Sequence, residues 1–133
     1  MPEPAASAAT VLLTEDNDHL RRIFALVFRS AGYTVLEAPD GVCAMELAAE
    51  HLPNLILMDL SLPKMDGWEA TRRIRADPAT AHIPILALSA FDRSTDLERT
   101  RQAGCVSHLT KQIDPKELLA EVRQWLEAPR DSG

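Results

Sequence analysis

Five short apolar runs alternate with helix-like segments along this chain. The runs lie at residues 11–14, 33–37, 55–59, 83–88 and 106–109. Several are apolar at nearly every position, which is typical of strands buried on both faces of a sheet. Strand and helix patterns that alternate in this way predict a parallel sheet with helices on both faces and right-handed crossovers.

The first two intervening segments carry amphipathic helical patterns. In the first, apolar residues recur at intervals of three and four until Gly32, a residue type that favours helix ends. The second follows Asp40, a plausible N-cap. The side chains expected to face the core on these two helices are Leu20, Ile23, Phe24, Val27, Phe28, Ala31, Val42, Met45 and Ala49.

The remaining three segments have clear boundaries. A helix is expected over residues 67–77 because Pro78 disfavours its continuation. Another, over 94–103, has few apolar positions and ends at Gly104. The last begins at Pro115, a favourable residue for a first helical turn.

Length and composition favour one folded unit. The chain has 133 residues, 46% of them hydrophobic, which suits a single domain with a real core. We expect a folded domain over residues 10–127, a disordered lead-in over 1–9 and a flexible tail over 128–133. The formal charge of −6 argues against direct binding to nucleic acid.

The chain shows neither a secretory signal nor an apolar run long enough to cross a bilayer, so a cytoplasmic location without membrane contact is expected. The two cysteines, Cys43 and Cys105, are far apart and have no metal-binding spacing. They are interpreted as buried free thiols in a reducing compartment.

Candidate chemistry gathers where the apolar runs end. Parallel strands bring their carboxyl ends to one edge of a sheet, and these ends carry Glu15, Asp16, Asp59, Ser89 and Lys111. Three crowded carboxylates repel one another unless a cation lies among them, and their oxygen ligands suit Mg²⁺ or Mn²⁺. A carboxylate beside a hard cation, a hydroxyl and an ammonium is equipped to accept a phosphoryl group.

Each of these residues alone has an ordinary structural explanation. Asp16 can be a helix N-cap, Ser89 a loop hydroxyl and Lys111 a solvated lysine. Only their joint placement, one polar group or pair at each strand end, favours the chemical interpretation.

Four stretches resemble the receiver domains of two-component response regulators. They are LLTEDN (12–17), LILMDLSLPKMDGWEATRRIR (55–75), IPILALSA (83–90) and HLTK (108–111), within a similarity that covers about residues 10–127. The resemblance implies an α/β, flavodoxin-like (βα)5 three-layer sandwich whose parallel five-stranded sheet has the order 2-1-3-4-5.

The resemblance also implies roles for individual residues. Asp59 would accept phosphate from a sensor histidine kinase or a histidine phosphotransfer protein, assisted by Ser89 and Lys111. Mg²⁺ (or Mn²⁺) would be held by Glu15, Asp16, Asp59 and the backbone carbonyl of Ser61.

The sequence departs from the family at three points. Gln112 follows Lys111 where the family usually has a cis proline, and we expect a trans bond because a cis bond to a non-proline residue costs about 2.5–4 kcal/mol. His108 stands where many receivers have an aromatic switch residue, so Ser89 and His108 are expected to move together. Ser61 and Phe91 occupy the positions that flank the path of the hydrolytic water, and the Phe91 ring is expected to restrict it.

The sequence thus predicts a stand-alone phosphoacceptor switch that catalyses only its own phosphorylation and dephosphorylation. Its expected output is a downstream effector protein that reads the helix over 94–103, the last strand and the last helix; the protein itself would be a monomer or weak dimer. Two alternatives remain: a phosphate-independent interaction module, and an aspartyl-phosphate phosphatase, which Ser61 in place of a second aspartate disfavours. The sequence also leaves open a receiver excised from a hybrid kinase.

Overall fold

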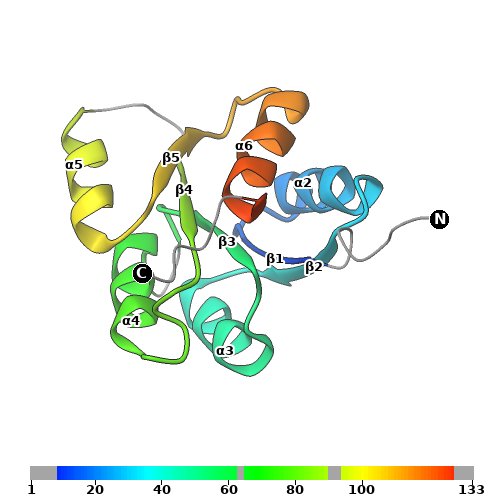
Figure 1. The fold of residues 1–133 in the computed structure, drawn as a ribbon. Coiled ribbons are helices and arrows are strands. Elements are labelled where there is room, and N and C mark those ends of the chain that lie inside the picture. Colours follow the sequence, from blue (N-terminus) through cyan, green and yellow to red (C-terminus); the bar gives the residue numbers. More distant parts are fainter. Residues whose placement is uncertain (1–8, 63–64, 90–93, 128–133) are drawn as a thin grey trace.

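The computed structural model describes residues 9–62, 65–89 and 94–127. Its strands form one parallel sheet in the order β2-β1-β3-β4-β5, which confirms the expected topology (Figure 1). The strands are β1 (Thr10–Thr14), β2 (Thr34–Ala38), β3 (Leu55–Asp59), β4 (Ile85–Ser89) and β5 (Ser107–Thr110).

Helices follow the strands in strict alternation. They are α2 (Asp18–Ser30), α3 (Gly41–His51), α4 (Gly67–Ala76), α5 (Ser94–Ala103) and α6 (Pro115–Glu127). Figure 1 shows α2 and α6 on one face of the sheet, α3 and α4 on the other, and α5 beside the β5 edge. The helix boundaries agree with the expected ones to within a few residues.

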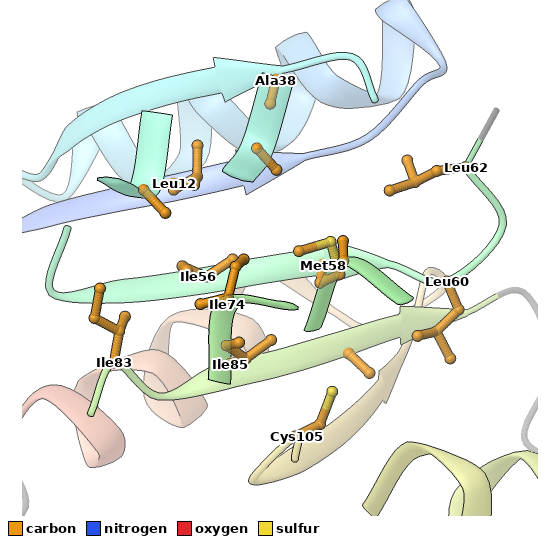
Figure 2. Packing of buried hydrophobic residues seen from close by; sticks show 14 residues of the cluster. Leu12, Ala38, Ile56, Met58, Leu60, Leu62, Ile74, Ile83, Ile85 and Cys105 are labelled. Atoms are coloured by element: carbon orange, nitrogen blue, oxygen red, sulfur yellow. The ribbon is translucent and has the colours of Figure 1, made fainter. Parts of the chain in front are cut away.

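The sheet separates two apolar cores, which explains why its central strands are apolar at every position. Leu12, Ile56 and Met58 point toward α3 and α4, where Ile74 and Ile85 also pack (Figure 2). The alternate strand residues belong to the second core, against α2 and α6: Val11, Leu13, Leu55, Leu57, Leu86 and Leu88.

Side-chain caps begin helices α2, α3 and α4. Asp40 and Asp66 accept hydrogen bonds from the N–H groups of Cys43 and Glu69, at 2.8 and 2.9 Å, and so begin α3 and α4. The cap of α2 is Asn17, whose Oδ1 accepts from the N–H of Leu20 at 2.9 Å. Because Asn17 does this work, Asp16 is not needed as a cap.

Four side chains expected to face the core are exposed instead. Ile23 is 43% exposed and Val42 is 40% exposed, and Ala31 and Ala49 also face solvent. Helix α3 turns three small residues, Gly41, Ala44 and Ala48, toward the core, which brings its backbone close to the neighbouring chain. A β-carbon at Gly41 would lie 2.6 Å from the carbonyl oxygen of Met65.

Other sequence-based expectations have mixed outcomes. The described residues contain no cis peptide bond, so Lys111 and Gln112 are joined in trans as expected. Both cysteines are free, but only Cys105 is buried, and Cys43 is half-buried. No helix in the described ranges combines the length and apolar character that a membrane crossing requires.

Candidate functional site

Three carboxylates meet at the carboxyl edge of the sheet. Glu15 and Asp16 follow β1, and Asp59 ends the neighbouring strand β3. One oxygen from each side chain lies within 4.8 Å of the other two. Glu15 and Asp59 are fully buried, whereas Asp16 is exposed. The sheet order therefore brings together the acidic residues that the sequence keeps more than forty positions apart.

Lys111, at the end of β5, supplies the positive charge in this cluster. Its Nζ lies 2.9 Å from Asp59 Oδ2 and 3.2 Å from Glu15 Oε1. Its backbone N–H donates to the carbonyl of Ser89 at 2.8 Å, which fixes the β5 end beside β4. Burial disfavours the ammonium, but the hydrogen bond and charge of Asp59, aided by Glu15, outweigh burial and raise the pKa of Lys111.

The surroundings of Glu15 make its carboxyl group a weaker acid than usual. Burial, reinforced by the charge of Asp59, raises its pKa to about 7, against the opposing effects of the Asn17 N–H and of Lys111. Its Oε2 accepts from the N–H of Asn17 at 3.1 Å and from Lys111 at 3.3 Å. Its buried Oε1 accepts no hydrogen bond from any described residue.

The oxygen ligands of this cluster fit a hard divalent cation. A buried carboxylate oxygen without a hydrogen-bond donor is costly, and one lysine cannot balance three carboxylates. Mg²⁺ and Mn²⁺ prefer oxygen ligands of this kind. Among the residues predicted as ligands, Glu15, Asp16 and Asp59 are in place to hold such an ion.

The backbone of Ser61 lies at the same edge. Its N–H donates to Asp59 Oδ1 at 2.9 Å, so the two oxygens of Asp59 are held by different groups, Ser61 and Lys111. The Ser61 side chain is exposed. The other expected gate residue, Phe91, lies outside the described residues.

Ser89 and His108 form a direct pair beside the cluster. Ser89 ends β4, one residue beyond the position paired with Asp59, and His108 lies on β5. The Ser89 hydroxyl is 2.7 Å from His108 Nε2, and the imidazole tautomer decides which atom donates. The structure thus joins these two predicted switch residues by a hydrogen bond.

His108 also borders an open groove of about 360 Å³ along α5 and β5. Other residues lining this groove include Glu98, Arg101 and Val106. The groove does not lie over the carboxylates, but His108 connects the two places because it borders the groove and touches Ser89.

Sequence reasoning missed Arg21, which contacts the backbone of the acidic cluster rather than its carboxylates. Its Nη1 donates to the backbone carbonyl of Glu15 at 2.9 Å. Its Nε lies 3.2 Å from Glu37 Oε1, at the end of β2. The only available signal was the adjacency of the first two strands, since neither Arg21 nor Glu37 belongs to a motif used in the prediction.

The fold and site together define an α/β domain with a candidate cation site at the carboxyl edge of its parallel sheet. The family model described as the response regulator receiver domain matches residues 11–123, and the chain belongs to this family. The chain is therefore a receiver domain of two-component signalling.

Individual relatives agree with this assignment. The polar-differentiation response regulator DivK of Brucella anthropi is 35% identical over 117 residues, which cover 88% of this chain and 95% of DivK. The receiver domain of a sensor histidine kinase from Pseudomonas aeruginosa PAO1 is 36% identical to this chain, and its structure matches with a TM-score of 0.86. The match covers 91% of this chain and 99% of that one. That structure has a magnesium ion coordinated in its active-site cleft. The chemotaxis protein CheY4 of Vibrio cholerae is 26% identical with a TM-score of 0.84, over 88% and 98% of the two chains.

Proposed function

We propose that Asp59 accepts a phosphoryl group from a phosphohistidine, carried by a sensor histidine kinase or a histidine phosphotransfer protein. The observation that carries this proposal is the position of Asp59, a buried carboxylate 2.9 Å from Lys111 Nζ and within the acidic cluster. The chain would act as a switch that catalyses only its own phosphorylation and dephosphorylation, within a domain spanning residues 10–127.

The chemistry needs little from the protein beyond placement. An oxygen of the ionised Asp59 carboxylate forms the new O–P bond while the P–N bond of the phosphohistidine breaks, and the leaving imidazole takes the electron pair and then a proton. Lys111 would balance the negative charge on the transferred group, and the Ser89 hydroxyl would donate to one of its oxygens. No general base is required, since the carboxylate is already the nucleophile.

A divalent cation is part of this proposal. Asp16, Asp59 and the backbone carbonyl of Ser61 would hold Mg²⁺ or Mn²⁺ directly, and Glu15 would act mainly through water. When bound, the ion neutralises charge on the phosphoryl oxygens. Support comes from the buried Glu15 oxygen that accepts no hydrogen bond from a described residue and from the closeness of the three carboxylates.

The output would pass through the Ser89–His108 pair. A phosphoryl group on Asp59 would attract Ser89 away from His108, whose ring borders the groove between α5 and β5. The face made of α5, β5 and α6 would then change its preferred arrangement, and a downstream effector protein would read it. Ser61 and Phe91 would flank the path of the water that later hydrolyses the acyl phosphate.

The test is uptake of one phosphoryl group. The chain is incubated with phosphoramidate and magnesium chloride, and its intact mass is measured. We expect a gain of one phosphoryl group that Asp59→Asn abolishes and that chelation of the metal prevents. Asp77→Asn is the matched control because Asp77 follows α4, away from the acidic cluster, and should leave uptake unchanged.

The same experiment addresses the alternative of a phosphate-independent interaction module. The trans Lys111–Gln112 bond and the histidine at position 108 are the features that favour this alternative. No mass gain with phosphoramidate or with candidate kinases, together with unaltered partner binding, would support the module and contradict the phosphoacceptor role.

A further inference from the structure

Arg21 occupies an unusual place on α2, because its guanidinium is largely buried between three acceptors. Its Nη1 donates to the Glu15 carbonyl at 2.9 Å, and its Nη2 to Asp18 Oδ1 at 2.7 Å. Its Nε donates to Glu37 Oε1 at 3.2 Å. The side chain is only 14% exposed, so these contacts hold it in one arrangement.

The first of these contacts falls on a critical peptide group. The Glu15 carbonyl belongs to the peptide bond that joins Glu15 to Asp16, the two acidic residues that β1 contributes to the cluster. On the other side of Glu15, its own N–H donates to the carbonyl of Ala38 at 3.0 Å. The backbone of Glu15 is thus held from both sides, and the orientation of this peptide plane fixes the directions in which both carboxylates leave the chain.

The segment after β1 that carries Glu15 and Asp16 needs such restraint. Glu15 and Asp59 are buried within reach of each other and repel, which favours displacement of the loop that carries Glu15. Mg²⁺ requires near-ideal octahedral geometry with ligands at about 2.0–2.1 Å, so small displacements of its ligands weaken binding.

Arg21 is itself anchored independently of the cluster. Glu37, at the end of β2, binds both Arg21 and Arg29, the latter at 3.1 Å. The Asp18 contact adds a second carboxylate on the exposed side. These anchors connect the loop after β1 to the adjacent strand end through a planar guanidinium, which can bond several acceptors in fixed directions.

We propose that Arg21 is a positioning residue for the divalent-cation site, acting through the Glu15–Asp16 peptide group rather than by contact with the ion. This inference rests on the proposed function, since it concerns the metal-binding step of the same site. Outer partners of metal ligands typically change metal affinity by about 10–100-fold when they are removed.

The test compares Arg21→Met with Arg29→Met. Both remove a guanidinium from Glu37, but only the first removes the donor to the Glu15 carbonyl. The full chain is titrated with magnesium chloride and followed by NMR at the amides of residues 15–17 and 59–61. We expect Arg21→Met to weaken magnesium binding about tenfold. Arg29→Met should leave it within about twofold of the wild type, because Arg29 contacts Glu37 and the Val35 carbonyl and none of the proposed ligand residues.

A spectroscopic readout separates positioning from a merely structural role. The carbonyl ¹³C of Glu15 and the amide ¹⁵N of Asp16 belong to the peptide group that Arg21 contacts, and their shifts should change in Arg21→Met without added metal. Arg21→Lys keeps the charge but not the planar fork, and should give a smaller loss of affinity. This milder variant also serves if Arg21→Met does not fold.

The outcomes are distinguishable. If the wild type binds magnesium and the Arg21 variants bind it equally well, the positioning role is overturned while the proposed function stands. A similar loss in Arg29→Met would also overturn it, because the effect would then follow from the Glu37 network in general. If the wild type itself shows no magnesium binding, both the metal-dependent function and the positioning role fail.

Discussion

Lys111 is the residue on which the electrostatics of the acidic cluster depend. It contacts two fully buried carboxylates, Asp59 and Glu15, and no other described cation lies within ion-pair distance of either one. Removing one partner of a buried ionic contact is costly because the remaining charge is left without compensation. Glu15 can relieve part of that cost by taking up a proton, since its pKa is already raised to about 7.

We therefore predict that Lys111→Met lowers the free energy of unfolding by about 2 kcal/mol in the absence of metal. Magnesium should restore more stability to this variant than it adds to the wild type, because the ion replaces the missing positive charge. Urea unfolding with and without magnesium chloride measures both effects. Lys116→Met, at an exposed position on α6, is the control and should behave as the wild type. Equal stability of the Lys111→Met and wild-type proteins without metal would contradict this view.

Cys105 provides a second prediction at this scale. Burial raises the pKa of its thiol, against the smaller effects of Thr71 and Arg75. The folded state therefore holds the thiol proton more tightly than the unfolded chain does. This stabilisation is fully present below the unfolded pKa of about 8.5 and is lost as the pH rises toward the folded pKa.

Stability should accordingly fall as the pH rises above about 8.5, and Cys105→Ala should flatten that fall. Urea unfolding at several pH values gives the slopes. Cys43→Ala should change the slope less, because the Cys43 thiol is only half-buried. An unchanged alkaline slope in Cys105→Ala would assign the loss of stability to other groups.

At the scale of elements, α5 is attached to the molecule mainly through α4. The indole N–H of Trp68 on α4 donates to the Thr100 hydroxyl at 3.1 Å, and the Arg99 guanidinium lies 3.8 Å from the centre of the Trp68 ring. Thr100 is 2% exposed, so its hydroxyl depends on this partner. These contacts restrain the helix that the proposed switch would shift.

Trp68→Phe should therefore loosen α5 selectively. It removes the N–H donor, leaves a buried hydroxyl unpaired and should cost about 1–2 kcal/mol. Hydrogen exchange of the α5 amides should accelerate while that of α3 is unchanged. Trp125→Phe is the matched control, because the Trp125 indole donates to Glu121 within α6 at 2.9 Å and should affect α6 instead. Uniform acceleration in every helix would mean that Trp68 supports the whole fold rather than α5.

For the whole molecule, the sequence predicts the layers well because its signals are local. Continuous apolar runs indicated buried parallel strands, and the residues after those runs indicated the edge where Glu15, Asp16, Asp59 and Lys111 meet. Strand limits shifted by one or two positions, since an apolar residue such as Ile83 can be buried before its strand begins.

What the sequence could not indicate depends on tertiary contacts. The helical period alone placed Ile23 and Val42 inside, but the width of the buried stripe is set by how closely each helix approaches the sheet. The role of Arg21 could not be predicted because its partners, Glu15 and Glu37, are brought to it by the pairing of β1 with β2. The Ser89–His108 hydrogen bond likewise requires the register of β4 and β5.

The metal site should also affect the stability of the whole molecule. A ligand that binds only the folded chain stabilises it by about 1.4 kcal/mol at ten times its dissociation constant. Magnesium chloride should therefore raise the Tm, whereas sodium chloride at the same ionic strength should not. Asp16→Asn should remove most of the rise in Tm. A wild-type Tm that does not change with magnesium chloride would argue against the metal site.

The described side chains of α5 contribute to neither of the two apolar cores, although Ala103 is buried. The outward residues of this helix can therefore change without creating a cavity in either core. Selection on partner choice and selection on folding then act on largely separate sets of residues. Under the proposed function, a duplicated copy of the gene could acquire a new effector by altering α5 and the groove beside it, while the acidic cluster and the stability of the sheet are inherited intact.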